Sequence, residues 1–317
     1  MRLVTEHKPV MAVSLNTAWQ KILLFPHLDY GNVNRARCLI QCGGGKGVNV
    51  ARALRRLGYP VIFAGFRGGP TGKLLAEEFA GSGVRDISLE TAAVTRTCCT
   101  VVSEDDRKVT ELIEPSEPVT SEENACLLDR VLSEIPGSGA VLFVGSVPPG
   151  VSDDFSAQVA SGAAKHGIPF VLDAVKGLDQ ILRHPCRLLK VNADELRAIT
   201  GTESLQEGAR RLFGSFPALE SIGVTDGPRP AFFFTRDHHW RLEIPRLENV
   251  VNPIGGGDCT DAIITLRISQ GLRPEELPRA FGEALAYASA SCLTDIPAVF
   301  DPEVAETLAG QIRISES

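Results

Sequence analysis

The segment Asn252-Pro-Ile-Gly-Gly-Gly-Asp258 lies near the C-terminal end of the chain and is followed by the helical pattern Cys259–Gln270. Three successive glycines permit a tight turn and allow backbone N–H groups to approach an anion closely. The following helix would add the positive end of its dipole, so the segment predicts an anion-binding loop at the start of a helix. Asp258 has two interpretations. It is either an ordinary N-cap or the general base that takes a proton from a hydroxyl group attacking a phosphoryl group.

A second glycine-rich segment, Gly43-Gly-Gly-Lys-Gly-Val-Asn-Val-Ala-Arg52, predicts a turn that opens an amphipathic helix. Lys46 and Asn49 would point from the start of this helix toward a polar ligand. The segment is not a Walker A loop, because the residue after Lys46 is neither Ser nor Thr, and the same holds for Lys73. It also lacks the third glycine of a dinucleotide-binding fingerprint.

Short apolar runs alternate with helical patterns through most of the chain, and this alternation decides the fold class. Several runs are too short for helices, are rich in Val, Ile and Phe, and end in Gly, Asn or Asp, which is typical of buried strands. The predicted strands are Val10–Leu15, Val61–Phe66, Ala140–Gly145, Phe170–Asp173, Leu188–Asn192, Ser221–Thr225 and Ala231–Thr235. The alternation predicts one α/β domain over residues 1–317, with helices on both faces of a mostly parallel sheet.

Several of the intervening helices carry recognisable signals. Val50, Leu54 and Leu57 have helical spacing, and Thr120 with Glu123 has the spacing of a capping box. Ser152 is predicted to cap a helix that runs to His166.

Two stretches interrupt the alternation. Thr97–Ser103 and Lys108–Ile113 predict a β-hairpin joined by the charged turn Glu104–Arg107, and Leu23–Ile40 is irregular and partly extended. Together they predict a small β lid, from about residues 16–40 and 95–114, over the main sheet.

Composition limits the partners. The formal net charge of −7 argues against a nucleic-acid partner, since such proteins usually carry a basic patch. Arg52, Arg55 and Arg56 lie together on one predicted helix, where a solvated face is the favoured interpretation. Apolar runs such as Ala140–Val144 are far shorter than the ~20 residues that span a bilayer. Met1–Pro9 is polar and lacks the apolar segment of a secretory signal, so we expect a cytoplasmic protein with no membrane partner.

The eight cysteines have irregular spacing that does not match a zinc site, so we expect buried or free thiols.

Taken together and in order, the two glycine-rich segments resemble the PfkB (ribokinase-like) family of carbohydrate kinases, especially its 1-phosphofructokinase and tagatose-6-phosphate kinase branch. Further matching blocks are Ser14–Asn16, Gly31–Arg35, Gly68–Gly72, Thr95-Arg96, Gly145–Gly150, Lys190–Glu195 and Gly223–Gly227. The resemblance implies a three-layer α/β/α sandwich with a β lid. It also implies ATP and Mg²⁺ as cofactors, a sugar or sugar phosphate as acceptor, and a homodimer formed through the lid.

The resemblance also implies roles for individual residues. Asp258 would be the catalytic base, with the anion hole formed by Gly255, Gly256 and Gly257. Nucleotide-binding positions would be Lys190, Asn192, Thr225 and Gly227, and Mg²⁺ would be held through water by Asn192 and Glu195. Positions facing the sugar would be Asn16, Gln20, Gly44, Gly45, Lys46 and Asn49. The phosphate already on the sugar would be bound by Arg96 and Ser146, and a guanidinium fork suits that task.

Two departures leave the acceptor open. Gln20 stands where the family usually has an Asp facing the substrate, and an amide donates hydrogen bonds where a carboxylate only accepts them. The family's Asp-x-Ser-Gly block is altered to Asp173-Ala-Val-Lys-Gly177. We expect transfer of the ATP γ-phosphoryl group to fructose 1-phosphate, fructose 6-phosphate or tagatose 6-phosphate. The alternatives are a kinase of an unphosphorylated sugar or nucleoside, and a non-catalytic sugar-phosphate sensor.

Overall fold

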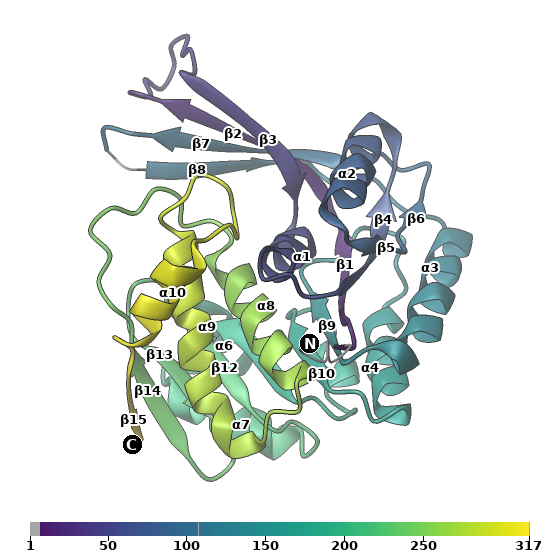
Figure 1. Ribbon diagram of the computed structural model, residues 1–317. Coiled ribbons are helices and arrows are strands. Elements are labelled where there is room, and N and C mark those ends of the chain that lie inside the picture. Colours follow the sequence, from purple (N-terminus) through teal and green to yellow (C-terminus); the bar gives the residue numbers. More distant parts are fainter. Residues whose placement is uncertain (1–6, 107, 317) are drawn as a thin grey trace, which may run out of the picture.

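The computed structural model describes residues 7–106 and 108–316. In this part of the chain, helices cover both faces of a main sheet and a smaller sheet projects from one end (Figure 1). The path through the main sheet runs in the order β15 (Arg313–Glu316), β14 (His239–Glu243), β13 (Ala231–Phe234), β12 (Ile222–Thr225), β11 (Leu188–Asn192), β10 (Phe170–Asp173), β9 (Ala140–Val144), β1 (Val10–Asn16), β4 (Val61–Arg67) and β5 (Arg85–Asp86), with β6 (Leu89–Glu90) also paired to β4. The pairs from β12 to β5 are parallel, whereas β13, β14 and β15 add antiparallel strands at one edge. The mostly parallel sheet that the alternation predicts is therefore confirmed, and each predicted strand lies within one residue of its observed bounds.

Two apolar cores fill the space between this sheet and its helices. Side chains alternate between the faces of a strand, so Val10 and Ala12 of β1 join one core while Met11 and Val13 join the other. The first core is covered by α1 (Lys46–Arg56), α2 (Gly69–Ser82), α8 (Gly256–Ser269), α9 (Leu277–Ser291) and α10 (Pro302–Ala309). The second is covered by α3 (Ser121–Glu134), α4 (Phe155–Lys165), α5 (Leu178–Ile181), α6 (Ala193–Thr200) and α7 (Leu205–Ser215). The result is the expected three-layer arrangement.

The predicted helix starts have different outcomes. Thr120 caps α3, and its side chain and that of Glu123 form the predicted capping box. The prediction for Ser152 is wrong. The N-cap of α4 is Asp154, which makes no side-chain capping bond, and the Ser152 hydroxyl instead accepts a hydrogen bond from Asn124 of α3 at 3.2 Å.

The smaller sheet, called the lid sheet below, has the strand order β3 (Cys38–Gly44), β2 (Ala18–Phe25), β7 (Arg96–Ser103) and β8 (Lys108–Ile113). The antiparallel β7–β8 pair confirms the predicted hairpin, while Arg107 of its turn lies outside the described residues. The stretch Leu23–Ile40 is irregular and partly extended, as predicted: it contains the end of β2 and the start of β3, and residues 26–37 between them belong to no helix or strand. Because β3 continues to Gly44, the lid sheet extends beyond the expected limit at residue 40 and ends inside the second glycine-rich segment.

The interpretation of the α1 arginines as a solvated face holds for Arg56, which is exposed, but is wrong for Arg52. The Arg52 side chain is 14% exposed and forms an ion pair with Glu78 of α2 at 2.8 Å. Arg55 and Arg56 donate to backbone carbonyl groups of neighbouring segments.

Among the residues that the structure describes, no helix has the length and apolar character needed to cross a bilayer. The polar stretch Met1–Glu6 lies outside them. All eight cysteines are free thiols, as expected.

Candidate active site

A cavity of about 710 Å³ lies between the lid sheet and the carboxyl ends of the central parallel strands, the edge at which open α/β sheets generally bind ligands. Its walls come from β1, the lid sheet, the start of α1, the end of β10 and the glycine loop before α8. The structure brings together in this cavity eleven of the predicted site residues, namely Asn16, Gln20, Gly44, Gly45, Lys46, Asn49, Arg96, Ser146, Glu195, Gly255 and Asp258.

The glycine loop 255–257 forms the N-terminal end of α8. Gly255 is the N-cap with φ 82°, a left-handed conformation, and a Cβ there would lie 2.9 Å from the Pro297 side chain, so only glycine fits. The first N–H groups of a helix have no partner within the helix and can bind an anion. Asp258 is the third residue of α8 and does not cap it, so the N-cap interpretation of Asp258 is wrong.

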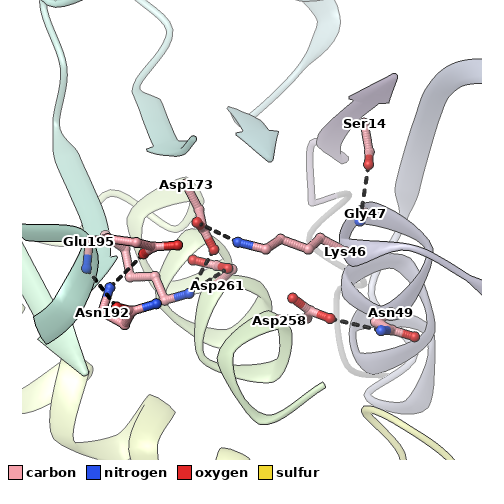
Figure 2. A network of polar contacts seen from close by, with 10 residues as sticks. Ser14, Lys46, Gly47, Asn49, Asp173, Asn192, Glu195, Asp258 and Asp261 are labelled. Atoms are coloured by element: carbon pink, nitrogen blue, oxygen red, sulfur yellow. Dashed lines mark hydrogen bonds and ion pairs between the residues drawn. The ribbon is translucent and has the colours of Figure 1, made fainter. Parts of the chain in front are cut away.

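Asp258 is buried against α1. Its Oδ2 accepts a hydrogen bond of 2.7 Å from Nδ2 of Asn49, and the two side chains point toward each other from α8 and α1 (Figure 2). Burial raises the pKa of Asp258, and the hydrogen bond from Asn49 opposes that rise. A carboxyl group with this raised pKa is a better proton acceptor than a fully solvated one, while the Asn49 bond favours its ionised form.

Four charged side chains meet beside Asp258. Lys46 of α1 donates to Asp173 Oδ1 at 2.9 Å (Figure 2). Lys190 of β11 donates to Asp173 Oδ2 at 2.6 Å. Lys190 also lies 3.2 Å from Oδ2 of Asp261, which is on α8 one turn after Asp258. Asp173 thus receives two ammonium groups, whereas Asp261 has one longer contact.

This difference separates the pKa values of the two carboxyl groups. Burial alone would raise the pKa of Asp173, but Lys190 and Lys46 outweigh it and hold that pKa below its ordinary value. Burial and the neighbouring Asp173 raise the pKa of Asp261 well above its ordinary value. The Oδ1 atom of Asp261 is buried and has no hydrogen-bond partner in residues 7–106 and 108–316.

Asn192 and Glu195 form a capping box at the start of α6. The Asn192 side chain accepts from the Glu195 N–H, and the Glu195 carboxylate accepts from the Asn192 N–H, each at 2.8 Å (Figure 2). Structural capping alone explains both contacts. The Glu195 side chain nevertheless lines the cavity, with only Oε2 engaged in the box. One carboxylate of this kind fits Mg²⁺, which keeps several waters and uses few protein ligands beside substrate phosphates.

The polar groups on the opposite wall come from β1, the lid sheet and the segment just after β9. Asn16 Nδ2 donates to the Ser146 hydroxyl at 3.0 Å. The Gln20 side chain is buried and donates to Thr100 on the neighbouring strand β7, while its Oε1 lies beside Gly44. The Nε of Arg96 is buried and has no hydrogen-bond partner among the described residues. A donor without a partner at a cavity wall suits an anionic ligand.

The remaining predicted residues lie behind or beside the cavity. A Cβ on Gly257 would be 3.1 Å from Nζ of Lys190, so this lysine lies directly under the glycine loop, where Gly256 continues the helix start. Asn192 and Thr225 are paired at the ends of β11 and β12, and Gly227 follows in the next turn. Neither Thr225 nor Gly227 lines the cavity. The sequence interpretation missed Asp173 and Asp261 as members of the charged group. Their only sequence signal was the position of Asp173 at a strand end and of Asp261 one helical turn after Asp258.

Comparisons with known proteins agree with this architecture. Residues 15–298 match the family described as pfkB family carbohydrate kinase. The fold is similar to phosphofructokinase-2 from Escherichia coli in complex with substrates and products (22% identity, TM-score 0.86, covering 96% of this chain and 99% of that one). It is also similar to a protein described as a possible 1-phosphofructokinase from Thermotoga maritima (21% identity, TM-score 0.83, 97% and 99% covered). A third similar structure is Arabidopsis thaliana ribokinase complexed with ribose and ATP (22% identity, TM-score 0.73, 96% and 99% covered).

Proposed function

From its membership of the pfkB family of carbohydrate kinases, we propose that this ATP-dependent sugar kinase phosphorylates a ketohexose phosphate. In this proposal Asp258 is the general base. The observation that carries the proposal is the pairing of a buried carboxylate with the glycine loop at the start of α8. Asp258 and Gly255, the N-cap of that helix, line one cavity. Phosphoryl transfer requires this combination of a proton acceptor and an anion-binding site.

In the proposed reaction, a hydroxyl group of the sugar gives its proton to an Asp258 carboxylate oxygen as its own oxygen attacks the γ-phosphorus. The bond from that phosphorus to the bridging oxygen of ADP breaks. The N–H groups of Gly256 and Gly257 stabilise the charge on the transferring group, since such donors act strongly in a site that excludes water. Asn49 holds Asp258 toward the acceptor through its 2.7 Å bond.

ATP and Mg²⁺ would lie on the α6 and α8 side of the cavity. Glu195 would hold Mg²⁺ through water, with Asn192 supporting it, and Lys190 would add positive charge beneath the glycine loop. When bound, Mg²⁺ neutralises charge on the phosphate oxygens. We assign Thr225 and Gly227 to the outer part of the nucleotide site, because β12 ends next to Asn192.

A phosphorylated acceptor is favoured by Arg96. Within the described part of the chain, its Nε at the cavity wall has no hydrogen-bond partner, and its Nη1 makes a 3.4 Å contact with the Glu114 carbonyl oxygen. A phosphate group would satisfy these donors. The sugar hydroxyls would lie in the space between Arg96 and Asp258, which is lined by Asn16, Gln20, Gly44, Gly45 and Lys46. The Ser146 hydroxyl accepts a hydrogen bond from Asn16.

The competing function is phosphorylation of an unphosphorylated sugar or nucleoside. Its support is Glu111, which lines the same cavity and would repel a phosphate but accept hydrogen bonds from hydroxyl groups.

A coupled assay of ADP release decides between these functions. The purified protein, with ATP and MgCl₂, is offered fructose 1-phosphate, fructose 6-phosphate, tagatose 6-phosphate, the corresponding free sugars and a set of nucleosides. We expect the highest kcat/KM with one of the phosphorylated ketohexoses. Preference for a free sugar or nucleoside would favour the competing function, and binding of a sugar phosphate without turnover would favour a sensor.

We further propose that two copies pair through the outer face of the lid sheet. Cross-strand pairing places Leu39, Leu23 and Val101 in one row on that face, next to the half-exposed Leu112. An apolar row on a projecting sheet suits a partner sheet. Light scattering after gel filtration should give the mass of a dimer for the natural chain and of a monomer for Leu23→Glu.

A further inference from the structure

Arg52 occupies the centre of a polar network that none of the proposed catalytic roles includes. Its Nη1 donates to Asn49 Oδ1 at 2.7 Å and to the Pro297 carbonyl oxygen at 3.2 Å. Its Nη2 donates to the Gly43 carbonyl oxygen at 2.6 Å and to Glu78 Oε1 at 2.8 Å. One guanidinium group therefore joins the lid sheet, α1, α2 and the segment that packs against the glycine loop.

The bond to Asn49 fixes the orientation of that side-chain amide. An amide presents oxygen on one side and NH₂ on the other, and a guanidinium can only donate. With its oxygen held by Arg52, Asn49 must turn its Nδ2 toward Asp258, as observed in the 2.7 Å bond. Rotation of the amide would place an oxygen next to the carboxylate and would favour the protonated form of Asp258.

The bond to Pro297 supports the glycine loop. A Cβ on Gly255 would lie 2.9 Å from the Pro297 side chain and 3.0 Å from the Ala298 nitrogen, so this segment packs directly against the loop. Ala298 has φ 58°, a left-handed conformation that is costly for a residue with a Cβ. Such a conformation persists only where its surroundings hold it, and the Arg52–Pro297 bond is one of the contacts that do so.

The bonds to Gly43 and Glu78 anchor Arg52 itself. Glu78 accepts hydrogen bonds from both the Gly43 N–H and Arg52. Because Arg52 also donates to the Gly43 carbonyl oxygen, both backbone groups of this residue at the end of β3 are hydrogen-bonded. A planar fork can make these contacts together, whereas a lysine ammonium cannot reach them all from one atom.

We propose that Arg52 is a positioning residue that orients Asn49, and through it the Asp258 carboxylate. The same guanidinium group connects Pro297, beside the glycine loop, with Gly43 at the end of β3 in the lid sheet. The inference rests on the proposed role of Asp258 as the general base. Arg52 itself does not line the cavity and need not contact the substrate.

The test compares Arg52→Lys, which keeps the charge and loses the fork, with Arg55→Met as the matched control. Arg55 is on the same helix and donates to two backbone carbonyl groups without touching Asn49. For each protein, kcat and KM are measured across pH, and the Asp258 carboxyl group is titrated by ¹³C NMR in the free protein, with its signal assigned by its loss in Asp258→Asn. The other charged groups facing Asp258 stay unchanged in both variants, namely Lys46, Lys190 and Asp173.

In Arg52→Lys we expect kcat to fall on the order of 10- to 100-fold, with KM for ATP nearly unchanged. The acid limb of kcat and the NMR titration should both move upward by about one pH unit, and Arg55→Met should show neither effect. A folded Arg52→Lys protein with kcat within about twofold of the natural chain and an unshifted titration would overturn the inference.

If Arg52→Lys does not fold, Glu78→Gln takes its place, because it loosens the same guanidinium. Changes of the same sign would support the inference and their absence would refute it. Full activity of Asp258→Asn would instead contradict the proposed catalytic base, and the carboxyl titration would still show whether Arg52 controls Asp258.

Discussion

Replacement of Asp258 by Asn should remove catalysis and leave the fold intact. The change exchanges one carboxylate oxygen for an NH₂ group, and the remaining oxygen can still accept the 2.7 Å bond from Asn49. A bond to a neutral acceptor is weaker by about 1 kcal/mol than one to a charged group. Loss of negative charge in the first turn of α8 costs about 0.3–1 kcal/mol more. Removal of a buried charge works in the opposite direction, because burial disfavours the ionised form. The free energy of unfolding should therefore change by no more than about 1 kcal/mol.

The effect on the rate should be much larger. Asn cannot accept the hydroxyl proton, so kcat should fall on the order of 10²–10⁴-fold. This corresponds to about 2.7–5.5 kcal/mol in the activation barrier. ATP binding should survive, because the Glu195 carboxylate, Lys190 and the backbone N–H groups of the glycine loop are all retained.

The assay combines kcat, a thermal melt and an ATP titration on one preparation. Asp301→Asn is the matched control, since Asp301 caps α10 by accepting from the Glu303 N–H and lies away from the cavity. Asn caps helices about as well as Asp, so this control should keep both its stability and its kcat. Near-normal kcat in a folded Asp258→Asn protein would refute the proposed base. A lowered melting temperature together with lost activity would show that the structural argument for a neutral substitution is wrong.

Three further predictions concern the acceptor and the charged group. Arg96→Ala should raise KM for the sugar phosphate by about 10- to 100-fold and leave KM for ATP nearly unchanged, because a charge-assisted bond to phosphate is lost; equal KM values for phosphorylated and free sugar in the natural chain would contradict this. Gln20→Asp should change the ranking of kcat/KM among fructose 1-phosphate, fructose 6-phosphate and tagatose 6-phosphate, and an unchanged ranking would mean that this side chain does not contact the sugar. Asp261 has a raised pKa in the folded state, so its stabilising contribution is present at low pH and is lost as pH rises through that pKa. Asp261→Asn should therefore gain stability relative to the natural chain as pH rises above the ordinary carboxyl pKa of about 4, as measured by urea unfolding at a series of pH values, and parallel stability curves would refute the assignment.

The features that the sequence predicts well are those determined by neighbouring residues. The parallel strands follow from short β-branched runs, and the capping box of Thr120 and Glu123 follows from a three-residue spacing. The two glycine segments could be placed at helix starts for the same reason. The prediction for Ser152 failed although its chemistry was reasonable, because Asn124 of another helix binds its hydroxyl. A competing partner of this kind cannot be seen in a local pattern.

The charged group beside Asp258 depends on distant contacts and was only partly predicted. Lys46, Asp173 and Asp261 come from three separate elements, and their meeting follows from the strand order of the sheet rather than from any spacing along the chain. The burial of Arg52 has the same origin, since Glu78 and Pro297 reach it from other segments. Arginines on an amphipathic helix look solvated until the neighbouring elements are in place.

The position of Lys190 explains why the last glycine of the loop matters beyond its flexibility. A Cβ at Gly257 would lie 3.1 Å from the Lys190 Nζ, tighter than an ordinary contact, so a side chain there would push the ammonium group away or shift the loop. With glycine, the positive charge of Lys190 adds to the partial positive charge of the α8 N-terminus at the same place. Asp173 and Asp261 hold Lys190 there and keep it charged, because their attraction outweighs the effect of burial on its pKa. The anion-binding capacity that we assign to the loop thus depends on three buried side chains below it as well as on its backbone.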